Sequence, residues 1–176
     1  MCSSDLLVLP KLLESRAANR RIRIWSAACS SGQEPYSLAM TLAEESARLQ
    51  GWTFDILGTD LSAAMVDRAR AGTYSQFEVQ RGVSPPMLAK YFNRDGDKWT
   101  IVPSIRSTVS FREFNLLNDP TPFGQFDVIF CRNVLIYFDQ ETKARVLARL
   151  SQRLPGDGTL YLGGAETVIG ITDRFE

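Results

Sequence analysis

The chain has 176 residues, 44% of them apolar, and its 20 lysines and arginines are balanced by 20 aspartates and glutamates. This length predicts a single domain with one sizeable core. Because the net charge is zero, nothing draws the chain as a whole towards nucleic acid or anionic lipid, and we expect neither as a partner. No apolar stretch approaches the length of a membrane span and no secretory leader is visible, so direct membrane insertion is not expected.

The sequence contains no histidine and only three cysteines, Cys2, Cys29 and Cys131. The absence of histidine excludes Ser-His-Asp and Cys-His catalysis, together with histidine-ligated metal sites. The cysteines lack the spacing of a zinc site, so no metal is predicted. An odd, scattered set of thiols is typical of a reducing compartment, which predicts a cytoplasmic location. Cys29 is interpreted as small filler of a loop rather than as a nucleophile.

Residues 21–25 alternate polar and apolar side chains, which predicts a strand. A run of small residues that includes Ala28 and Gly32 follows, and then a helix opens with Pro35 in its first turn. Because these side chains have almost no bulk, a cofactor can lie against the peptide groups of the loop, near the helix N-terminus. An ordinary tight strand-to-helix connection is the alternative, since one such turn is a weak signal.

Residues 54–60 read as a second strand, which ends in the carboxylate of Asp60. Ser62 is a good cap for a helix over residues 63–71, and Gly72 would end it. In nucleotide-binding α/β sheets an acidic residue at this strand end accepts hydrogen bonds from both ribose hydroxyls. We therefore favour ribose binding by Asp60, with simple capping of the helix as the alternative.

A segment that a minimal nucleotide-binding sheet does not need comes next. Residues 87–92, after two prolines, predict a short helix, and residues 93–97 predict a turn. The runs at 99–102 and 109–114 look like strands, and we expect them to pair as an inserted antiparallel β hairpin. The sequence thus predicts an inserted β subdomain at about residues 93–114.

A nearly continuous apolar run at residues 126–131 predicts a parallel strand buried on both faces, and Arg132, Asn133 and Tyr137 follow it. In open α/β sheets ligands bind beyond the carboxyl ends of the strands, so these side chains are expected beside the small-residue loop and Asp60.

The last predicted elements are a helix over residues 140–154 and a strand over 159–162. Glu166 is interpreted as a carboxylate at a helix start, with a functional role as the alternative. The elements together predict an α/β fold with a mostly parallel sheet and flanking helices.

Four segments resemble the CheR chemotaxis methyltransferases, and the resemblance extends from about residue 7 to residue 176. They are residues 28–37, 58–62, 115–117 and 130–138, of which the last, FCRNVLIYF, is the most specific. The resemblance implies a Rossmann-like class I methyltransferase fold with an inserted small antiparallel β element. It also implies an enzyme that transfers the methyl group of S-adenosylmethionine to glutamate side chains of chemoreceptors, giving glutamate methyl esters and S-adenosylhomocysteine.

The resemblance also assigns roles to residues. Besides the loop residues Ala28 and Gly32, the cofactor contacts would fall on Glu34, Asp60, Asn115, Leu116, Arg132 and Asn133. Tyr137 would lie near the methyl group, and we expect it to orient the acceptor carboxylate together with an arginine. Arg132 is one candidate for that arginine, and the cluster Arg16, Arg20, Arg21 and Arg23 offers others. The inserted β element would dock a receptor tail, or would be a lid or a simple embellishment of the fold, and the sequence favours neither reading.

The proposed chemistry agrees with the absence of histidine. A glutamate side chain has an unperturbed pKa of about 4.3, so at neutral pH it is already an anion and needs no general base. The protein must only place the carboxylate oxygen in line with the methyl group and exclude water. Two alternatives stay open: a methyltransferase of a small carboxylate acceptor, and a non-catalytic fragment that binds the cofactor or a receptor.

The chain departs from the family at both ends. The N-terminal helical domain and the Thr-x-Phe-Phe-Arg segment typical of the family are absent from this sequence, and residues 1–6 are unlike the family. We therefore expect residues 1–6 to be a non-native leader and residues 7–176 to be an incomplete catalytic domain. The chain is expected to act as a monomer.

Overall fold

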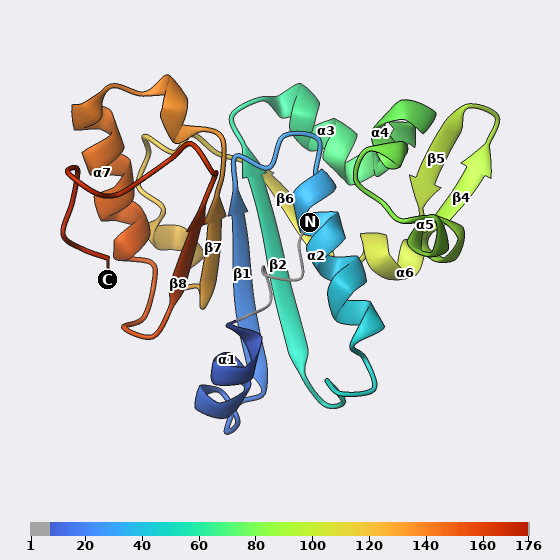
Figure 1. Ribbon diagram of the computed structural model, residues 1–176, viewed down its shortest axis with the longest axis horizontal. Helices are drawn as coiled ribbons and strands as arrows, with labels where there is room; N and C mark the ends of the chain where they lie inside the picture. The colour runs from blue at the N-terminus through green and yellow to red at the C-terminus, as the bar shows by residue number, and fades with distance from the viewer. Residues whose placement is uncertain (1–7, 176) are drawn as a thin grey trace.

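A computed structural model describes residues 8–175 of the chain. Its centre is a five-stranded, fully parallel sheet with the strand order β6-β2-β1-β7-β8. The strands are β1 (Arg21–Ala27), β2 (Thr53–Asp60), β6 (Val109–Glu113), β7 (Val128–Cys131) and β8 (Thr159–Leu162). Helices lie on both faces, and a small antiparallel sheet stands at the opposite end of the molecule from helix α7 (Gln140–Ser151) (Figure 1). The predicted α/β fold class is confirmed.

The alternation of side chains along the strands creates two cores, one on each face of the sheet. Ile22 and Ile24 of β1 belong to the core under the first three helices, whereas Trp25 belongs to the core under α7. Trp25 is fully buried, and its indole nitrogen donates to Thr59 Oγ1 at 2.9 Å, so its polar group is satisfied inside the core. The helices that pack on these two cores from the faces of the main sheet include α1 (Leu9–Ser15), α2 (Gln33–Glu44), α3 (Ala63–Ala71) and α7 (Gln140–Ser151).

Local capping signals fix the ends of α3 as predicted. Ser62 Oγ accepts a hydrogen bond from the Met65 backbone N–H at 3.4 Å, and Gly72 ends the helix with a φ of 62°. The predicted helix at 140–154 is shorter than expected. It begins after the cap Asp139 and ends at Ser151, because the chain turns there towards Phe126, whose N–H donates to the Arg153 carbonyl.

The small antiparallel sheet differs from the predicted hairpin. Its order is β3-β5-β4, and its hairpin joins β4 (Phe92–Asp95) to β5 (Lys98–Ile101), with β3 (Thr73–Ser75) on the other side of β5. The prediction that residues 109–114 form the second hairpin strand is wrong, because β6 pairs in parallel with β2 in the main sheet. The short helix α6 (Pro103–Arg106) turns the chain back to that sheet after β5.

Two further short helices complete the inserted segment. The predicted short helix starts earlier than expected, since α5 (Pro85–Tyr91) begins at the prolines themselves, where their missing N–H groups cost no helical hydrogen bond. Helix α4 (Gln76–Gln80) was not predicted. It starts with a capping box, in which Ser75 and Glu78 each accept a hydrogen bond from the other's backbone.

Gly58 in β2 leaves room for the ring of Phe111. A Cβ at this position would lie 2.7 Å from two ring carbons of Phe111 and 3.1 Å from Cys29 Sγ. We expect Gly58→Ala to lower the free energy of unfolding by about 1–3 kcal/mol, because the packed core must shift. Gly82→Ala is the matched control, since nothing lies within 4 Å of its added Cβ. Urea unfolding measures both, and equal midpoints would contradict this account of the packing.

Candidate functional site at the carboxyl edge of the sheet

The parallel register brings the predicted site residues to one edge. Ala27 lies opposite Thr59 on one side and Cys131 on the other, so β1, β2 and β7 end at the same level. Asp60 is the last residue of β2, and Ala28 and Arg132 directly follow β1 and β7, so all three lie at this carboxyl edge. The end of β6 joins them, because the Phe114 N–H donates to the Asp60 carbonyl at 2.8 Å.

The loop after β1 has a backbone that favours small residues. Ala28, Ser30 and Gly32 all have positive φ angles, of 61°, 51° and 83°. A Cβ on Gly32 would lie 2.8 Å from the Cβ of Ala69, so glycine is required there both by conformation and by space. The Cys29 N–H donates to the Thr59 carbonyl at 2.8 Å, which fixes the loop to the end of β2.

Asp60 holds two backbone groups at once. Its Oδ2 accepts from the Ser30 N–H at 2.8 Å, and its Oδ1 accepts from the Ser62 N–H at 3.0 Å. The bond from Ser62 is the helix-capping role given above as the alternative for Asp60. The bond from Ser30 ties the loop after β1 to the end of β2. Each carboxylate oxygen can accept more than one hydrogen bond, so Asp60 has capacity for ribose hydroxyls beyond these two amides. Ribose binding by Asp60 stays a prediction.

Glu34 and Arg132 meet across β1 and β7. Glu34 lies in the first turn of α2, where the helix dipole favours a negative charge. Its Oε1 accepts from Ser26 Oγ at 2.8 Å, and its Oε2 lies 3.3 Å from Nη1 of Arg132. Two residues to which the resemblance assigns cofactor contacts thus form one partly buried ion pair at the carboxyl edge.

Asn115 and Leu116 follow β6 at the same edge. The Asn115 side chain accepts from the Leu117 N–H at 2.9 Å and so closes a tight turn. Leu116 is buried against the α7 core, which leaves its main chain, rather than its side chain, available to a ligand. Arg149 of α7 donates to the carbonyls of Leu117 and Asn118 and holds this turn from outside.

Tyr137 ends the 3-10 helix η3 (Leu135–Tyr137), which follows β7, and 78% of its surface is exposed. Arg132 is the only one of the proposed acceptor-orienting arginines at this edge among the described residues. Arg21 opens β1 at the opposite edge of the sheet, and Arg16 binds Asp127 and Asp157 there. The alternatives Arg16, Arg20, Arg21 and Arg23 are therefore wrong for this role.

The role expected for Glu166 is also wrong. Within residues 8–175 no helix follows it. Instead its carboxylate accepts hydrogen bonds from the backbone N–H groups of Asn133, Val134 and Leu135, immediately after β7. The sequence signal was misleading because the partners lie more than thirty positions away in the chain.

Tyr74 is a site-supporting residue that the sequence did not reveal. It lies in β3, and its buried hydroxyl donates to the Ser31 carbonyl at 2.7 Å, so it joins the small sheet to the loop after β1. Burial raises the pKa of Tyr74, which keeps the hydroxyl a donor at any ordinary pH. A lone aromatic residue before a short helix carries no signal for such a long-range bond.

We expect Tyr74→Phe to lower the free energy of unfolding by about 1–3 kcal/mol, because the buried Ser31 carbonyl loses its donor. Thermal or urea unfolding measures this loss. A Tyr74→Phe protein as stable as the parent would contradict the proposed link between the small sheet and the loop.

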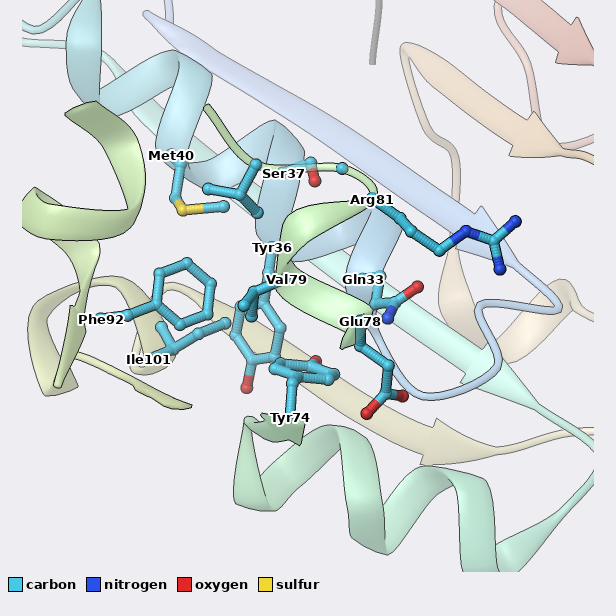
Figure 2. Close-up of a pocket in the computed structure, with 12 residues that line it drawn as sticks. Gln33, Tyr36, Ser37, Met40, Tyr74, Glu78, Val79, Arg81, Phe92 and Ile101 are labelled. Atoms are coloured by element: carbon cyan, nitrogen blue, oxygen red, sulfur yellow. The ribbon is translucent and has the colours of Figure 1, made fainter. Parts of the chain in front are cut away.

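A cavity of about 130 Å³ lies between α2 and the small sheet. Figure 2 shows the rings of Tyr36 and Tyr74 gathered there with Met40, Phe92 and Ile101, while Arg81 extends away from them. Among the described residues that line this cavity, none is one of the predicted cofactor contacts. The cavity is thus adjacent to the loop after β1 but separate from the edge where those contacts converge.

The cysteines in the described range are buried thiols. Burial raises the pKa of Cys29 to about 12, so the thiol stays protonated at neutral pH and is a poor nucleophile. Cys131 is buried in the α7 core, and burial raises its pKa as well. Among residues 8–175, no cluster of cysteine, aspartate and glutamate side chains could hold a metal ion, and no helix has the length and apolar character to cross a membrane.

Solved structures share this fold at low sequence identity. PKMT2 from Rickettsia typhi, in complex with AdoHcy, aligns with 81% of this chain and 21% of its own length, with a TM-score of 0.51 and 17% identity. The glycopeptide N-methyltransferase MtfA, complexed with sinefungin, aligns with 87% of this chain and 47% of its own length, with a TM-score of 0.50 and 9% identity. These likenesses support the Rossmann-like fold.

Similarity to proteins of known sequence is much higher. Residues 5–176 match the family model described as "CheR methyltransferase, SAM binding domain". Chemotaxis protein methyltransferase 1 of Pseudomonas aeruginosa is 44% identical over 173 residues, which are 96% of this chain and 63% of that protein. The chemotaxis protein methyltransferase of Vibrio parahaemolyticus is 45% identical over 170 residues, or 94% and 62%. The chain spans less than two thirds of the length of these relatives, and it belongs to the CheR methyltransferase family, whose S-adenosylmethionine-binding domain it contains.

Proposed function

We propose that this chain binds S-adenosylmethionine at the carboxyl edge of the sheet and transfers its methyl group to glutamate side chains of chemoreceptors. The observation that carries the proposal is the convergence of three connections. Asp60 is bonded to the loop after β1, and Glu34, in the first turn of the helix that follows that loop, is paired with Arg132 after β7. Family membership supports the cofactor, and the names of the relatives support a role in chemotaxis.

The cofactor would lie across these connections. The small residues from Ala28 to Gly32 let its groups approach the backbone, and Asp60 accepts hydrogen bonds from the ribose hydroxyls. Asn115 and Leu116 would contact the adenine from the end of β6. Arg132 and Asn133, together with Glu34, would hold the remainder of the molecule at the ends of β1 and β7.

S-adenosylmethionine supplies an electrophilic methyl group on a sulfonium. The acceptor carboxylate oxygen forms the new bond to the methyl carbon, and the sulfur keeps the electron pair of the bond that breaks, so no proton moves. Tyr137 and Arg132 would orient the acceptor, since an exposed phenol and a guanidinium both donate hydrogen bonds to a carboxylate. The protein contributes proximity, alignment and exclusion of water.

The acceptor is tested with radiolabelled S-adenosylmethionine and two classes of substrate. Cytoplasmic fragments of chemoreceptors should take up base-labile methyl groups, released as methanol, whereas small carboxylic acids should not. Methylation of the small acids alone would favour the alternative of a small-acceptor enzyme. Binding of S-adenosylhomocysteine without any transfer would favour the non-catalytic alternative. Either of these two results would contradict the proposed reaction.

We expect Tyr137→Phe to lower the rate of methyl transfer by about tenfold or more while changing cofactor affinity little. The reason is that its hydroxyl would act on the acceptor and not on the cofactor. Single-turnover rates and calorimetric titration with S-adenosylhomocysteine measure the two quantities separately. An equal loss in both would show that Tyr137 acts through cofactor binding.

The remaining expectations concern the setting of the reaction. We propose that the chain works as a monomer in the cytoplasm, where the cytoplasmic domains of receptors can reach the carboxyl edge of the sheet. The small sheet β3-β5-β4 stands next to the loop after β1 and is a suitable contact element for such a partner. Whether it docks a receptor tail or acts as a lid stays open.

A further inference from the structure

We propose that Glu166 is a positioning residue, whose carboxylate holds the turn after β7 in the shape that presents Arg132, Asn133 and Tyr137 to cofactor and acceptor. The inference rests on the proposed function and adds to it a residue that touches neither ligand. Its basis is the set of contacts between the connection after β8 and the connection after β7.

The carboxylate of Glu166 is surrounded by backbone donors. Its Oε2 accepts from the N–H groups of Gly163 at 2.6 Å and Asn133 at 2.8 Å, and its Oε1 accepts from Leu135 at 2.7 Å and Val134 at 2.9 Å. Consecutive amides that point at one oxyanion form a concave anion site, and hydrogen bonds to a charged acceptor are roughly twice as strong as neutral ones. Here the chain fills that anion site with its own side chain.

The backbone of this turn is unusual and needs the four hydrogen bonds to the Glu166 carboxylate, which are called the clamp below. Asn133 has a φ of 58°, in the left-handed region that residues other than glycine seldom occupy. Asparagine tolerates this region better than most residues, but a single residue held there needs surrounding bonds to keep it in place. The hydrogen bonds from Asn133, Val134 and Leu135 to Glu166 supply them.

Gly163 shows how closely the two connections approach. A Cβ on Gly163 would lie 2.5 Å from Asn133 Oδ1 and 2.6 Å from Glu166 Oε2. The Glu166 N–H donates back to the Gly163 carbonyl at 2.9 Å, so a tight turn after β8 aims the carboxylate at the end of β7. A side chain at position 163 would therefore displace both Asn133 Oδ1 and the Glu166 carboxylate.

The clamp also reaches Tyr137 through the backbone. The Tyr137 N–H donates to the Val134 carbonyl at 3.2 Å, and η3 therefore starts from the clamped turn. Tyr137 itself is mostly exposed, so few contacts of its own hold the ring. A shift of Val134 would move the proposed acceptor-orienting hydroxyl as well as the cofactor-facing Asn133.

Glu166→Gln tests the inference, because the amide keeps the shape but replaces one acceptor oxygen by an NH₂ group that faces backbone donors. In ¹H–¹⁵N spectra the amide resonances of the four clamped residues should move. The dissociation constant for S-adenosylhomocysteine should rise by about tenfold, the equivalent of about one hydrogen bond, and the methyl-transfer rate should fall further. Glu141→Gln, at an exposed position in the first turn of α7, is the matched control and should change none of these.

Affinity is measured well below the unfolding temperature, where the variant is still folded. A loss of affinity then reports on the shape of the site and not on a loss of overall stability. Unchanged amide resonances, or a lowered melting temperature with parental affinity and rate, would overturn the positioning role while leaving the proposed function intact. Failure of the parent chain to bind S-adenosylhomocysteine would overturn the proposed function, and the positioning role with it. Partial recovery of affinity in Glu166→Asp, which restores the charge, would support the clamp.

Discussion

Replacing Asp60 with alanine is expected to weaken the binding of S-adenosylhomocysteine by at least about tenfold, and by up to about a hundredfold. The carboxylate would accept two hydrogen bonds from the ribose, and bonds with a charged partner contribute on the order of 1.5 kcal/mol or more each. Every 1.4 kcal/mol or so is tenfold in affinity. Isothermal titration calorimetry on the purified chain measures the change.

The control must separate ribose contact from support of the start of α3, because Asp60 also accepts from the Ser62 N–H. Ser62→Ala removes the cap of α3 and should cost about 1 kcal/mol of stability without changing affinity. If Asp60→Ala folds normally and binds like the parent, Asp60 has no part in the cofactor site. If Ser62→Ala loses as much affinity as Asp60→Ala, the effect comes from the start of α3 and not from the ribose.

Arg16→Met is expected to lower the free energy of unfolding by about 3 kcal/mol, the scale for losing one partner of a largely buried ion pair. Arg16 Nε lies 2.7 Å from Asp127 Oδ1, and the two side chains are only 17% and 11% exposed. The substitution leaves the buried Asp127 carboxylate with one donor among residues 8–175, the Arg23 N–H. Urea unfolding at neutral pH measures the loss.

Asp157 gives the same interaction a pH dependence. Its two oxygens accept from both terminal nitrogens of Arg16, and these hydrogen bonds lower its pKa to about 2. A depressed pKa in the folded state means stability that is present above the unfolded pKa of about 3.9 and is lost as the pH falls towards 2. Because half of the Asp157 side chain is exposed, solvent screening keeps this contribution small.

The matched control for Arg16→Met is Arg48→Met, since Arg48 is exposed and lies 4.0 Å from Glu45. It should change stability by less than about 0.5 kcal/mol. Arg16→Met should also flatten the loss of stability between pH 4 and pH 2. Equal unfolding midpoints for the two variants would contradict the structural role given to Arg16.

The sequence predicted the elements well where the signals were local. The helix over residues 63–71 was bounded correctly because a cap and a terminal glycine act within one turn. The strand predicted at 109–114 exists as β6, one residue shorter, but its partner was not predicted. An alternating pattern shows that a strand has a buried face, and it does not say which sheet receives it.

Site residues could be predicted where a general rule on parallel sheets places them together. Residues that support the site through long-range hydrogen bonds were missed. Parallel strands end at a common edge, so Asp60 and Arg132 could be expected together. The same rule excludes Arg21 and Arg23, because they stand at the start of β1 and so at the opposite edge. The supports from Tyr74 and Glu166 are single hydrogen-bonding side chains far away in sequence, and no local pattern marks them.

The central claim is that one adenosyl group binds across the ends of β1, β2, β6 and β7. The most direct test is a titration of the ¹⁵N-labelled chain with S-adenosylhomocysteine, followed by amide chemical shifts. The account predicts that the shifts concentrate at Ser30, Ser31, Asp60, Leu116 and Asn133. Shifts confined to the cavity between α2 and the small sheet, or none at saturating ligand, would contradict it.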